Sequence, residues 1–354
     1  MPRTVTDAER HFIEQMPKAE LHVHLEGSVY PETLLDLGRK NGLPLPFKNV
    51  AEARDWFQFR DFAHFMETYA AICSVLQDEE DYERITYEQA QRAHAQNIRY
   101  QEITFAPASF INPRNRASAD IIIAGLRAGA KSAREELGVT MQFILDPVRV
   151  RSTDEVMLCA RWFAANLGGG LVGFGLGGTE VGYPPGPFAD AFNYVRDAGG
   201  RLTIHAGETD GPESVWAALA VGSERIGHGV TSVHDPKLVS ELAERQIVLE
   251  VSPTSNVCLG VASDYAEHPF RRLHDAGVPV TVNSDDPPMF NTTLNNEYLV
   301  LAEHFDFTLD ELEAFSLRAV NAAFLPDAER AALADEFQTQ FATLMQYKAT
   351  TRNL

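Results

Sequence analysis

Residues 19–28 read AELHVHLEGS, a strand-like run that breaks at Glu26, Gly27 and Ser28. In a strand, residues two apart face the same side with Cα atoms roughly 7 Å apart, so His22 and His24 can converge on one metal ion. The alternative is a pair of structural histidines, each satisfied by its own hydrogen bonds. The metal interpretation therefore depends on further ligands elsewhere in the chain.

Three more apolar segments end in polar side chains. They read RLTIHAGE (residues 201–208), ERIGHG (residues 224–229) and VPVTVNSDD (residues 278–286). His205 follows the first apolar run, and His228 lies between two glycines of the second, where the backbone can approach a ligand closely. Asp285 and Asp286 close the third segment. Each segment repeats the pattern of the first, a buried strand followed by residues that can do chemistry.

Strand and helix patterns alternate along the chain. Apolar runs of strand length occur eight times, at residues 19–25, 98–106, 139–146, 171–176, 201–206, 224–228, 246–251 and 278–284. Helical patterns separate most of them, for example at residues 118–137, 152–166, 188–198, 213–221, 236–245 and 266–276. This alternation predicts an α/β fold with a parallel sheet, and eight units predict a closed (β/α)8 TIM barrel. Barrel enzymes carry their chemistry at the carboxyl ends of the strands, where the histidines and aspartates fall.

The first two strands are separated by more chain than one crossover needs. We predict extra helices inserted at about residues 30–96, and C-terminal helices at about residues 309–350. No linker, repeat or low-complexity tract divides the chain, so residues 1–354 are expected to form a single barrel domain. Within the insertion, Phe62, Phe65 and Tyr69 follow the spacing of a helix face. That face either packs in a core or forms an apolar wall over a planar substrate.

Composition limits the partners and the compartment. The formal net charge of −20 disfavours nucleic acid and anionic membrane surfaces. The N-terminus carries no apolar signal-peptide core, and no run reaches membrane-spanning length. Cys73, Cys159 and Cys258 lack the spacing of a disulfide framework or a thiolate zinc site. We expect a cytoplasmic protein that acts on a small molecule, and the sequence is compatible with a homo-oligomer.

The candidate ligands indicate the metal. Three imidazoles and one carboxylate, with no thiolate, suit Zn²⁺ best, although Fe²⁺, Co²⁺ or Mn²⁺ could occupy such a set. Many hydrolases on this architecture hold two metals bridged by a modified lysine on the fourth strand. Residues 171–178, which cover the fourth strand here, contain no lysine. The sequence therefore predicts one metal ion per chain.

Four motifs resemble those of the adenosine deaminase family and occur in the family's order. They read PKAELHVHLEGS (residues 17–28), HAGE (residues 205–208), RIGHG (residues 225–229) and NSDDP (residues 283–287). The resemblance extends from residue 17 to about residue 325. It implies one Zn²⁺ held by four residues, His22, His24, His205 and Asp285. It also implies hydrolytic deamination of a 6-aminopurine to the 6-oxo product and ammonia.

The resemblance implies a role for each remaining site residue. Glu208 would protonate N1, and His228 would position the attacking water at C6 and help to activate it, beside the catalytic ligand Asp285. Asp286 would accept a hydrogen bond at N7, and the backbone of Gly178 would meet N3. The chemistry agrees, because zinc lowers the pKa of bound water from about 15.7 to about 7 and a carboxylic acid suits proton transfer to a ring nitrogen. The other zinc deaminase design, with His-x-Glu and Pro-Cys-x-x-Cys, is not found in the sequence.

A few positions bear on the substrate. Gly175 stands where many adenosine deaminases have Asp, and Glu26 stands where nucleoside-specific members often have the Asp that meets the ribose. Residues 181–185, VGYPP, are more similar to adenine deaminases, whereas Gly178 matches the nucleoside enzymes and leaves space for a sugar. The segment is also similar to bacterial relatives that deaminate 6-aminodeoxyfutalosine, a nucleoside of the menaquinone pathway. We expect adenosine or 6-aminodeoxyfutalosine as substrate, bound by Glu26, Gly178 and Asp286.

Three alternatives stay open at the level of sequence. They are deamination of free adenine, a different mononuclear metal hydrolase acting on a cyclic amide or ester, and a non-catalytic barrel that binds a purine or a protein. Residues 252–256, SPTSN, match a further family motif, which we interpret as a loop that supports the site.

Overall fold

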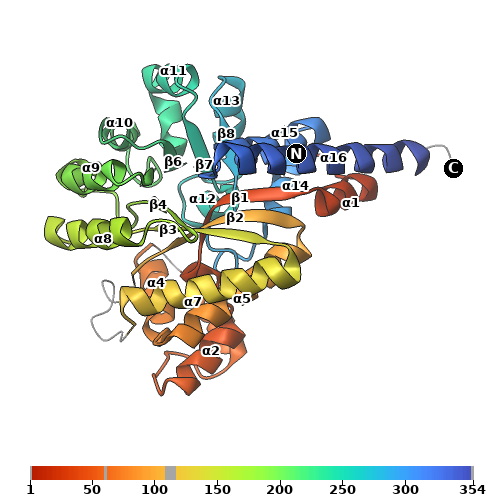
Figure 1. Ribbon diagram of the computed structural model, residues 1–354. Helices are drawn as coiled ribbons and strands as arrows, with labels where there is room; N and C mark the ends of the chain where they lie inside the picture. Colours follow the sequence, from red (N-terminus) through yellow and green to blue (C-terminus); the bar gives the residue numbers. More distant parts are fainter. Residues whose placement is uncertain (1, 60–61, 108–116, 352–354) are drawn as a thin grey trace.

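Eight parallel strands form one sheet that curls into a barrel surrounded by helices, in a computed structural model that describes residues 2–59, 62–107 and 117–351 (Figure 1). Each strand pairs with the next one in the chain, so the order around the sheet is β1 to β8. The strands are β1 (Lys18–His24), β2 (Ile98–Phe105), β3 (Thr140–Leu145), β4 (Leu171–Phe174), β5 (Arg201–Ala206), β6 (Arg225–His228), β7 (Val248–Val251) and β8 (Val280–Val282). The predicted strands are confirmed, with ends that differ by a few residues.

The barrel closes where β1 meets the chain just after β8. A parallel bridge joins Val23 to Asp285. The amide of His24 donates to the carbonyl of Asp285 at 2.9 Å, and the amide of Asp285 donates to the carbonyl of His22 at 3.2 Å. The predicted TIM barrel is therefore confirmed, and its closure lies at three residues that were predicted to bind a metal.

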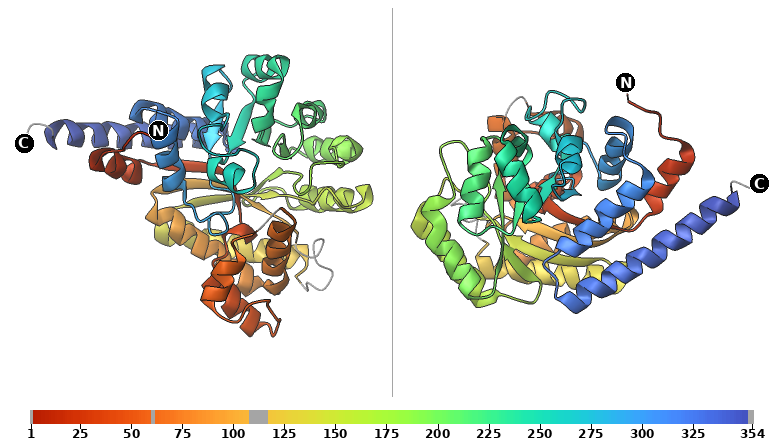
Figure 2. Two further views of the ribbon diagram at one scale, coloured as in Figure 1. Left: turned by 180° about the vertical axis from the view of Figure 1, so that it is seen from behind. Right: turned by 90° about the horizontal axis from the view of Figure 1, so that it is seen from above.

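Helices follow the strands and cover the outside of the barrel, as the view from above shows (Figure 2). They are α7 (Ala119–Ser132) with its extension η2 (Ala133–Leu137), α8 (Thr153–Asn166), α9 (Ala189–Asp197), α10 (Pro212–Ala220), α11 (Pro236–Glu244) and α13 (Phe270–Asp275). The short η3 (Gly186–Phe188), η4 (Val230–His234) and α12 (Pro253–Cys258) lie in the loops after the strands. Ser152 begins α8 with a capping box, in which its hydroxyl and the Glu155 carboxylate satisfy free amides of the first turn.

The predicted insertion between the first two strands is confirmed and occupies the lower part of Figure 1. It contains η1 (Glu26–Ser28), α2 (Pro31–Lys40), α3 (Val50–Trp56), α4 (Phe62–Val75) and α5 (Glu79–Ala95). Helix α5 packs closely on α7 because Gly125 and Gly129 of α7 have no side chain. A Cβ at Gly125 would lie 2.4 Å from the carbonyl oxygen of Glu79, and one at Gly129 would lie 2.7 Å from that of Glu83.

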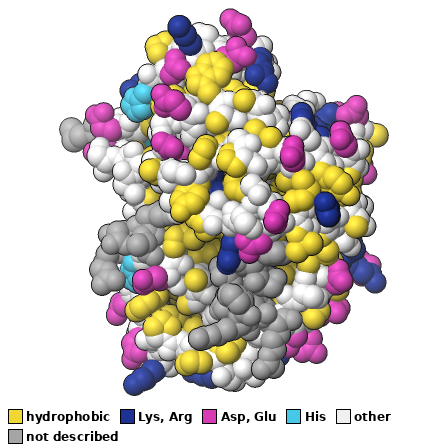
Figure 3. Space-filling model, turned by 90° about the vertical axis from the view of Figure 1, so that its left-hand side faces the viewer, with side chains coloured by type: hydrophobic (Ala, Val, Ile, Leu, Met, Phe, Trp, Pro, Cys, Tyr) yellow, Lys and Arg dark blue, Asp and Glu magenta, His cyan; other side chains and the backbone are white. Residues whose placement is uncertain are grey.

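The two ends of the chain add helices beside the barrel. Helix α1 (Asp7–Gln15) precedes β1, and α14 (Leu294–His304), α15 (Leu309–Ala322) and α16 (Asp327–Thr351) follow β8. Among the described residues, no helix combines the length and apolar character needed to cross a membrane. On the face in Figure 3, acidic and basic side chains are interspersed, and its described part carries no continuous basic surface.

Candidate active site

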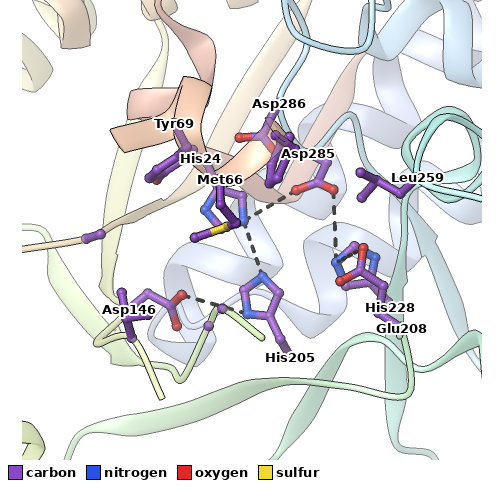
Figure 4. A pocket seen from close by; sticks show the side chains of 15 residues that line it. His24, Met66, Tyr69, Asp146, His205, Glu208, His228, Leu259, Asp285 and Asp286 are labelled. Atoms are coloured by element: carbon purple, nitrogen blue, oxygen red, sulfur yellow. Dashed lines mark hydrogen bonds and ion pairs between the residues drawn. The ribbon is translucent and has the colours of Figure 1, made fainter. Parts of the chain in front are cut away.

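The carboxyl ends of three strands bring the predicted metal ligands together, and Figure 4 labels His24, His205 and Asp285. His22 and His24 come from β1, His205 from β5, and Asp285 follows β8. Nε2 of His24 lies 3.2 Å from Nε2 of His205 and 3.3 Å from Oδ1 of Asp285. Nε2 of His22 lies 3.6 Å from the same Oδ1. Four donor atoms from distant parts of the sequence thus converge on one point.

Charge and burial at this point fit a divalent cation. Nε2 of His22 is buried and has no hydrogen-bond partner among the described residues. Burial lowers the pKa of His24 to about 4 and that of His205 well below its usual value, so both imidazoles are neutral at pH 7 and carry lone pairs. Burial opposes the charge of Asp285, but the facing His22 and the other imidazoles outweigh it and keep the pKa well below the usual range. Burial would lower the pKa of His22, but its interactions with Asp285 and Glu250 raise it to about 10, so a metal ion bound at Nε2 would displace a proton from this ring. Three imidazoles around an ionised carboxylate are a donor set typical of a metal centre.

His22 is oriented by a buried network of charged side chains, Glu250, Arg225 and Glu102, which we call the ladder. Its Nδ1 lies 3.0 Å from Oε2 of Glu250, on β7. Oε1 of Glu250 accepts from Arg225 at 2.6 Å and from the hydroxyl of Thr203 at 3.0 Å, and Arg225 also pairs with Glu102. A carboxylate on Nδ1 fixes the ring and leaves Nε2 free to bind a metal.

His228 and Asp285 adopt backbone conformations that few residues tolerate. Their φ angles are +64° and +63°, in the left-handed region. Asp and His enter this region more readily than most residues, and such strain persists only where surrounding contacts over-determine it. Here the hydroxyl of Ser255 donates to Oδ2 of Asp285 at 2.6 Å, and Asn256 contacts Nδ1 of His228 at 3.3 Å. Both supporting residues lie on α12, so the segment that we expected to be a loop is a short helix.

His228 belongs to two further groups of candidate donor atoms. One joins it to His22 and His205, and the other joins it to Glu208 and Asp285. Its Nε2 lies 3.6 Å from Oε1 of Glu208 and 4.0 Å from Oδ2 of Asp285. Burial lowers the pKa of His228 to about 3, which makes the ring neutral at pH 7.

Glu208 is held on the opposite side of the cluster by a second glutamate. The carboxylate of Glu180 accepts backbone N–H groups from Gly207 and Glu208 at 3.0 Å and from Asp210 at 3.3 Å, which fixes the loop after β5. Burial raises the pKa of Glu208 well above its usual value, and the nearby Asp285 and Glu180 raise it further. These effects favour the protonated form of Glu208, which can donate a proton into the site.

Asp286 points into the same cavity through space that a glycine leaves free. A Cβ on Gly27 would lie 1.6 Å from Oδ1 of Asp286. That oxygen is buried and has no hydrogen-bond partner among the described residues. Burial raises the pKa of Asp286 well above its usual value, and the charge of Asp285 adds to the shift. The protonated form of Asp286 is therefore favoured as well, in a carboxyl group that lines the cavity.

A cavity lies between these residues. Its polar side includes His24, His205, Glu208, His228, Asp285 and Asp286, and its apolar side includes Phe65, Met66, Tyr69, Val148 and Leu259. Phe65 and Tyr69 therefore form a wall of the cavity, the functional alternative for this helix face, while the side chain of Phe62 lies outside the described part. Gly178 also lines the cavity, at φ +86°. A Cβ there would lie 2.8 Å from Cγ1 of Val148, so backbone and packing already require this glycine.

The structure does not bring Glu26 into the cavity. Its carboxylate is fully buried, accepts from the hydroxyl of Tyr69 at 2.9 Å and accepts from the amide of Ala106 at 3.2 Å. Burial raises its pKa to about 7. The sequence predicted direct substrate contact, whereas the structure has Glu26 orienting Tyr69, which itself lines the cavity.

Asp146, just after β3, is a cavity residue that the sequence analysis missed. Its Oδ2 lies 3.8 Å from Nδ1 of His205. Two glycines leave room for it, since a Cβ on Gly175 would lie 2.2 Å from Oδ1 and one on Gly177 would lie 2.1 Å from Oδ2. The carboxylate thus occupies the space beside Gly175, the position where many adenosine deaminases have Asp. The sequence did contain a signal for Asp146, because this residue is a carboxylate directly after an apolar run of strand length.

Arg149 was also missed, because its partners are backbone atoms. It is buried, and its guanidinium donates to the carbonyl oxygens of Leu176 at 2.9 Å and of His205. It thereby joins the end of β4 to the strand that carries a candidate ligand.

Comparisons with known proteins agree with this geometry. The family model described as adenosine deaminase matches residues 17–340. An aminodeoxyfutalosine deaminase from Streptomyces avermitilis is 39% identical, over 93% of this chain and 92% of the relative. An adenine deaminase from Rhizobium leguminosarum bv. trifolii is 42% identical, over 90% of this chain and 98% of the relative. A solved amidohydrolase from Burkholderia ambifaria with bound Zn has a TM-score of 0.86 and 28% identity, over 97% of this chain and 96% of that one.

The contact between Asp146 and Gly177 allows a double-mutant test. We expect Asp146→Ala to weaken metal binding about 10- to 100-fold, measured by competition with a chelator, because His205 loses the carboxylate beside Nδ1. Gly177→Ala should weaken binding in the native background by displacing that carboxylate, but not in the Asp146→Ala background, because the three atoms nearest its new Cβ all belong to Asp146. Gly175→Ala is the control. Its Cβ would also meet the carbonyl oxygen of Thr203 at 2.9 Å, so this change should weaken metal binding in both backgrounds. Additive effects of Asp146→Ala and Gly177→Ala would contradict this assignment.

Proposed function

Because this chain belongs to the adenosine deaminase family, we propose that it uses one zinc ion to deaminate a 6-aminopurine nucleoside, with 6-aminodeoxyfutalosine as the leading candidate. The chain is a hydrolase acting on C–N bonds, of the class that deaminates 6-aminopurines. The observation that carries the proposal is the convergence of three imidazoles and the Asp285 carboxylate on one point, with the buried carboxyl group of Glu208 beside them. We further propose that the enzyme works in the cytoplasm as one barrel domain.

The ligands His22, His24, His205 and Asp285 would hold the metal. The fit rests on the buried, unpartnered Nε2 of His22 and on the other donor atoms that converge beside it. An N₃O donor set without thiolate favours zinc, and a similar solved amidohydrolase contains Zn. Bound there, the ion would lower the pKa of water from about 15.7 to about 7 and so supply a nucleophile at neutral pH.

Glu208 acts as the general acid in this proposal. The oxygen of water adds at C6 of the purine while Glu208 gives a proton to N1. Of the two protons that the water loses, one goes to the amino group, which leaves as ammonia to give the 6-oxo product, and the other restores Glu208. Burial favours the protonated form of Glu208 that this transfer needs. Its backbone is fixed by Glu180, which keeps the acid in place without contributing a proton itself.

Asp286 binds N7 as a donor, which corrects the expectation that it accepts. N7 of a purine carries a lone pair and no proton, so only the protonated form of Asp286 can hydrogen-bond to it. Burial and the neighbouring charge of Asp285 favour that form. The backbone of Gly178 would meet N3 on the other side of the base, where the glycine lines the cavity.

Similarity to a known enzyme supports a nucleoside. The relative named aminodeoxyfutalosine deaminase is 39% identical over 93% of this chain. Free adenine is the second candidate, because the relative named adenine deaminase is 42% identical. Gly178 does not decide between them, since its conformation and Val148 require glycine for structural reasons.

A matched pair of variants separates the metal from the acid. Glu208→Gln should keep about the native zinc content while kcat falls about 10²- to 10⁴-fold, because the amide cannot donate a proton as an acid does. His205→Ala should lose both zinc and activity, because the ion then lacks a ligand. Elemental analysis and steady-state rates on one preparation of each variant decide the point. Native zinc content in His205→Ala, or native kcat in Glu208→Gln, would contradict the assigned roles.

Asp286 can be tested with a substrate that lacks the atom it binds. The native enzyme should prefer a purine strongly over its 7-deaza analogue, because removing N7 leaves a buried carboxyl group unpaired. Asp286→Ala should keep zinc but lose most of that preference in kcat/KM. If the variant kept the native preference, Asp286 would serve only to support Asp285.

The substrate is tested by comparing kcat/KM for 6-aminodeoxyfutalosine, adenosine and adenine on the zinc-loaded enzyme. We expect 6-aminodeoxyfutalosine to be best and adenine to be worst, because a site that hydrogen-bonds a sugar is left with unpaired polar groups by the bare base. A value for adenine above those of both nucleosides would transfer the assignment to adenine deamination.

A further inference from the structure

A chain of hydrogen bonds runs from the backbone of α13 to His228. The backbone amide of Phe270 donates to Nδ1 of His268 at 3.2 Å. Nε2 of His268 lies 3.1 Å from Oδ1 of Asn256, and the amide nitrogen of Asn256 lies 3.3 Å from Nδ1 of His228. The three side chains are at most 3% exposed, so water does not compete for these contacts.

The direction of every bond in this chain follows from its first donor. A backbone N–H can only donate, so Nδ1 of His268 must present a lone pair and the proton of the ring lies on Nε2. That proton points at Asn256, which must accept it through Oδ1. The NH₂ group of Asn256 then faces His228 and donates to Nδ1, which leaves the proton of the neutral His228 ring on Nε2.

We propose that His268 is a positioning residue that fixes His228 as an Nε2–H donor to the reacting groups. The catalytic meaning of this inference rests on the proposed deaminase function. Nε2 of His228 faces the space between Oε1 of Glu208 and Oδ2 of Asp285, at 3.6 and 4.0 Å. His228 therefore orients the attacking water by donating a hydrogen bond and does not act as its base.

The same assignment separates His228 from the metal ligands. Its Nε2 lies in a group of donor atoms with His22 and His205, which alone would suggest a fourth imidazole ligand. A nitrogen that carries a proton has no lone pair to offer a metal. The chain of hydrogen bonds from His268 through Asn256 to His228, called the relay below, thus keeps His228 as a donor. The other three clustered imidazoles are left as ligands.

The surroundings of the relay resist its reversal. If the amide of Asn256 turned over, its NH₂ group would face Nε2–H of His268, and two donors would oppose each other. Turning the ring of His268 is also hindered, because Phe305 stacks on it with centroids 5.6 Å apart. The backbone of Asn256 is held on both sides, through bonds to Ser252 and Ala262, each at 3.0 Å.

The tautomer of His228 can be measured by ¹⁵N NMR of the histidine-labelled, zinc-loaded enzyme. We expect the native spectrum to show Nε2 of His228 protonated and Nδ1 unprotonated. Asn256→Asp should move the proton to Nδ1, because a carboxylate at that position only accepts, and kcat should fall with it. A wrong tautomer in a serine protease triad costs about 10⁴-fold in kcat, which sets the upper scale.

Variants of His268 test the origin of the relay. His268→Phe retains an aromatic ring beside Phe305 but cannot donate, so the preference for the Nε2–H tautomer should fall roughly tenfold, the worth of one hydrogen bond, and kcat should fall while KM changes little. His268→Gln should restore the tautomer, since its amide nitrogen takes the place of Nε2, whereas the shorter His268→Asn should not. His274→Leu is the control, because His274 lies on α13, six residues after His268, and contacts Phe307 and Phe315 but not the relay.

Two outcomes would overturn the inference. One is an Nδ1–H tautomer of His228 in the native enzyme, and the other is a native tautomer and native kcat in His268→Phe. Neither depends on the identity of the substrate, because the spectrum is recorded without turnover. An inactive protein with the expected tautomer would instead count against the proposed function alone.

Discussion

Two backbone hydrogen bonds between β1 and the residue after β8 are the constraint on which the site depends. They join His24 to Asp285 and Asp285 to His22, and so close the barrel at the residues that converge on one point. Asp285 reaches this position only with a left-handed backbone, which a small polar residue tolerates. The relative positions of these candidate ligands are therefore set by the closure of the fold.

Buried charge explains why this centre is stable and why it attracts a cation. Arg225 pairs with both Glu102 and Glu250, so no charge of the ladder below the site is left without a partner. Glu250 in turn orients His22, whose other ring nitrogen points at Asp285. Beside Asp285, burial raises the pKa of Glu208 and of Asp286, which favours the protonated forms that could donate a proton or a hydrogen bond to a purine. The same buried environment thus favours an ionised Asp285 and protonated neighbouring carboxyl groups.

The sequence predicts the barrel well because its signal is local and repeated. Each strand is an apolar run that ends in a turn. His205 and Asp285 could be recognised as candidate site residues because each lies at the end of such a run. Glu26 was misplaced because its partners, Tyr69 and the backbone of Ala106, lie in segments that only the tertiary fold brings beside it. Asp146 offered the same local signal as the predicted residues, but its value depends on two glycines of the neighbouring strand.

The support for the site was harder still to predict. The sequence analysis did not single out His268, since nothing in the neighbouring sequence connects it to His228. The bonds through Asn256 are visible only in three dimensions, and they set which nitrogen carries a proton. Packing and proton positions at this level depend on atoms from several elements at once, so no single stretch of sequence encodes them.

The central claim is that His22, His24, His205 and Asp285 hold one zinc ion. Anomalous diffraction recorded on both sides of the zinc absorption edge, from crystals of the protein purified without added metal, tests it most directly. The account predicts one anomalous peak per chain, bonded to the three Nε2 atoms and to the carboxylate of Asp285. No peak at the zinc edge, or a peak bonded to His228 or Glu208 instead of these ligands, would contradict it.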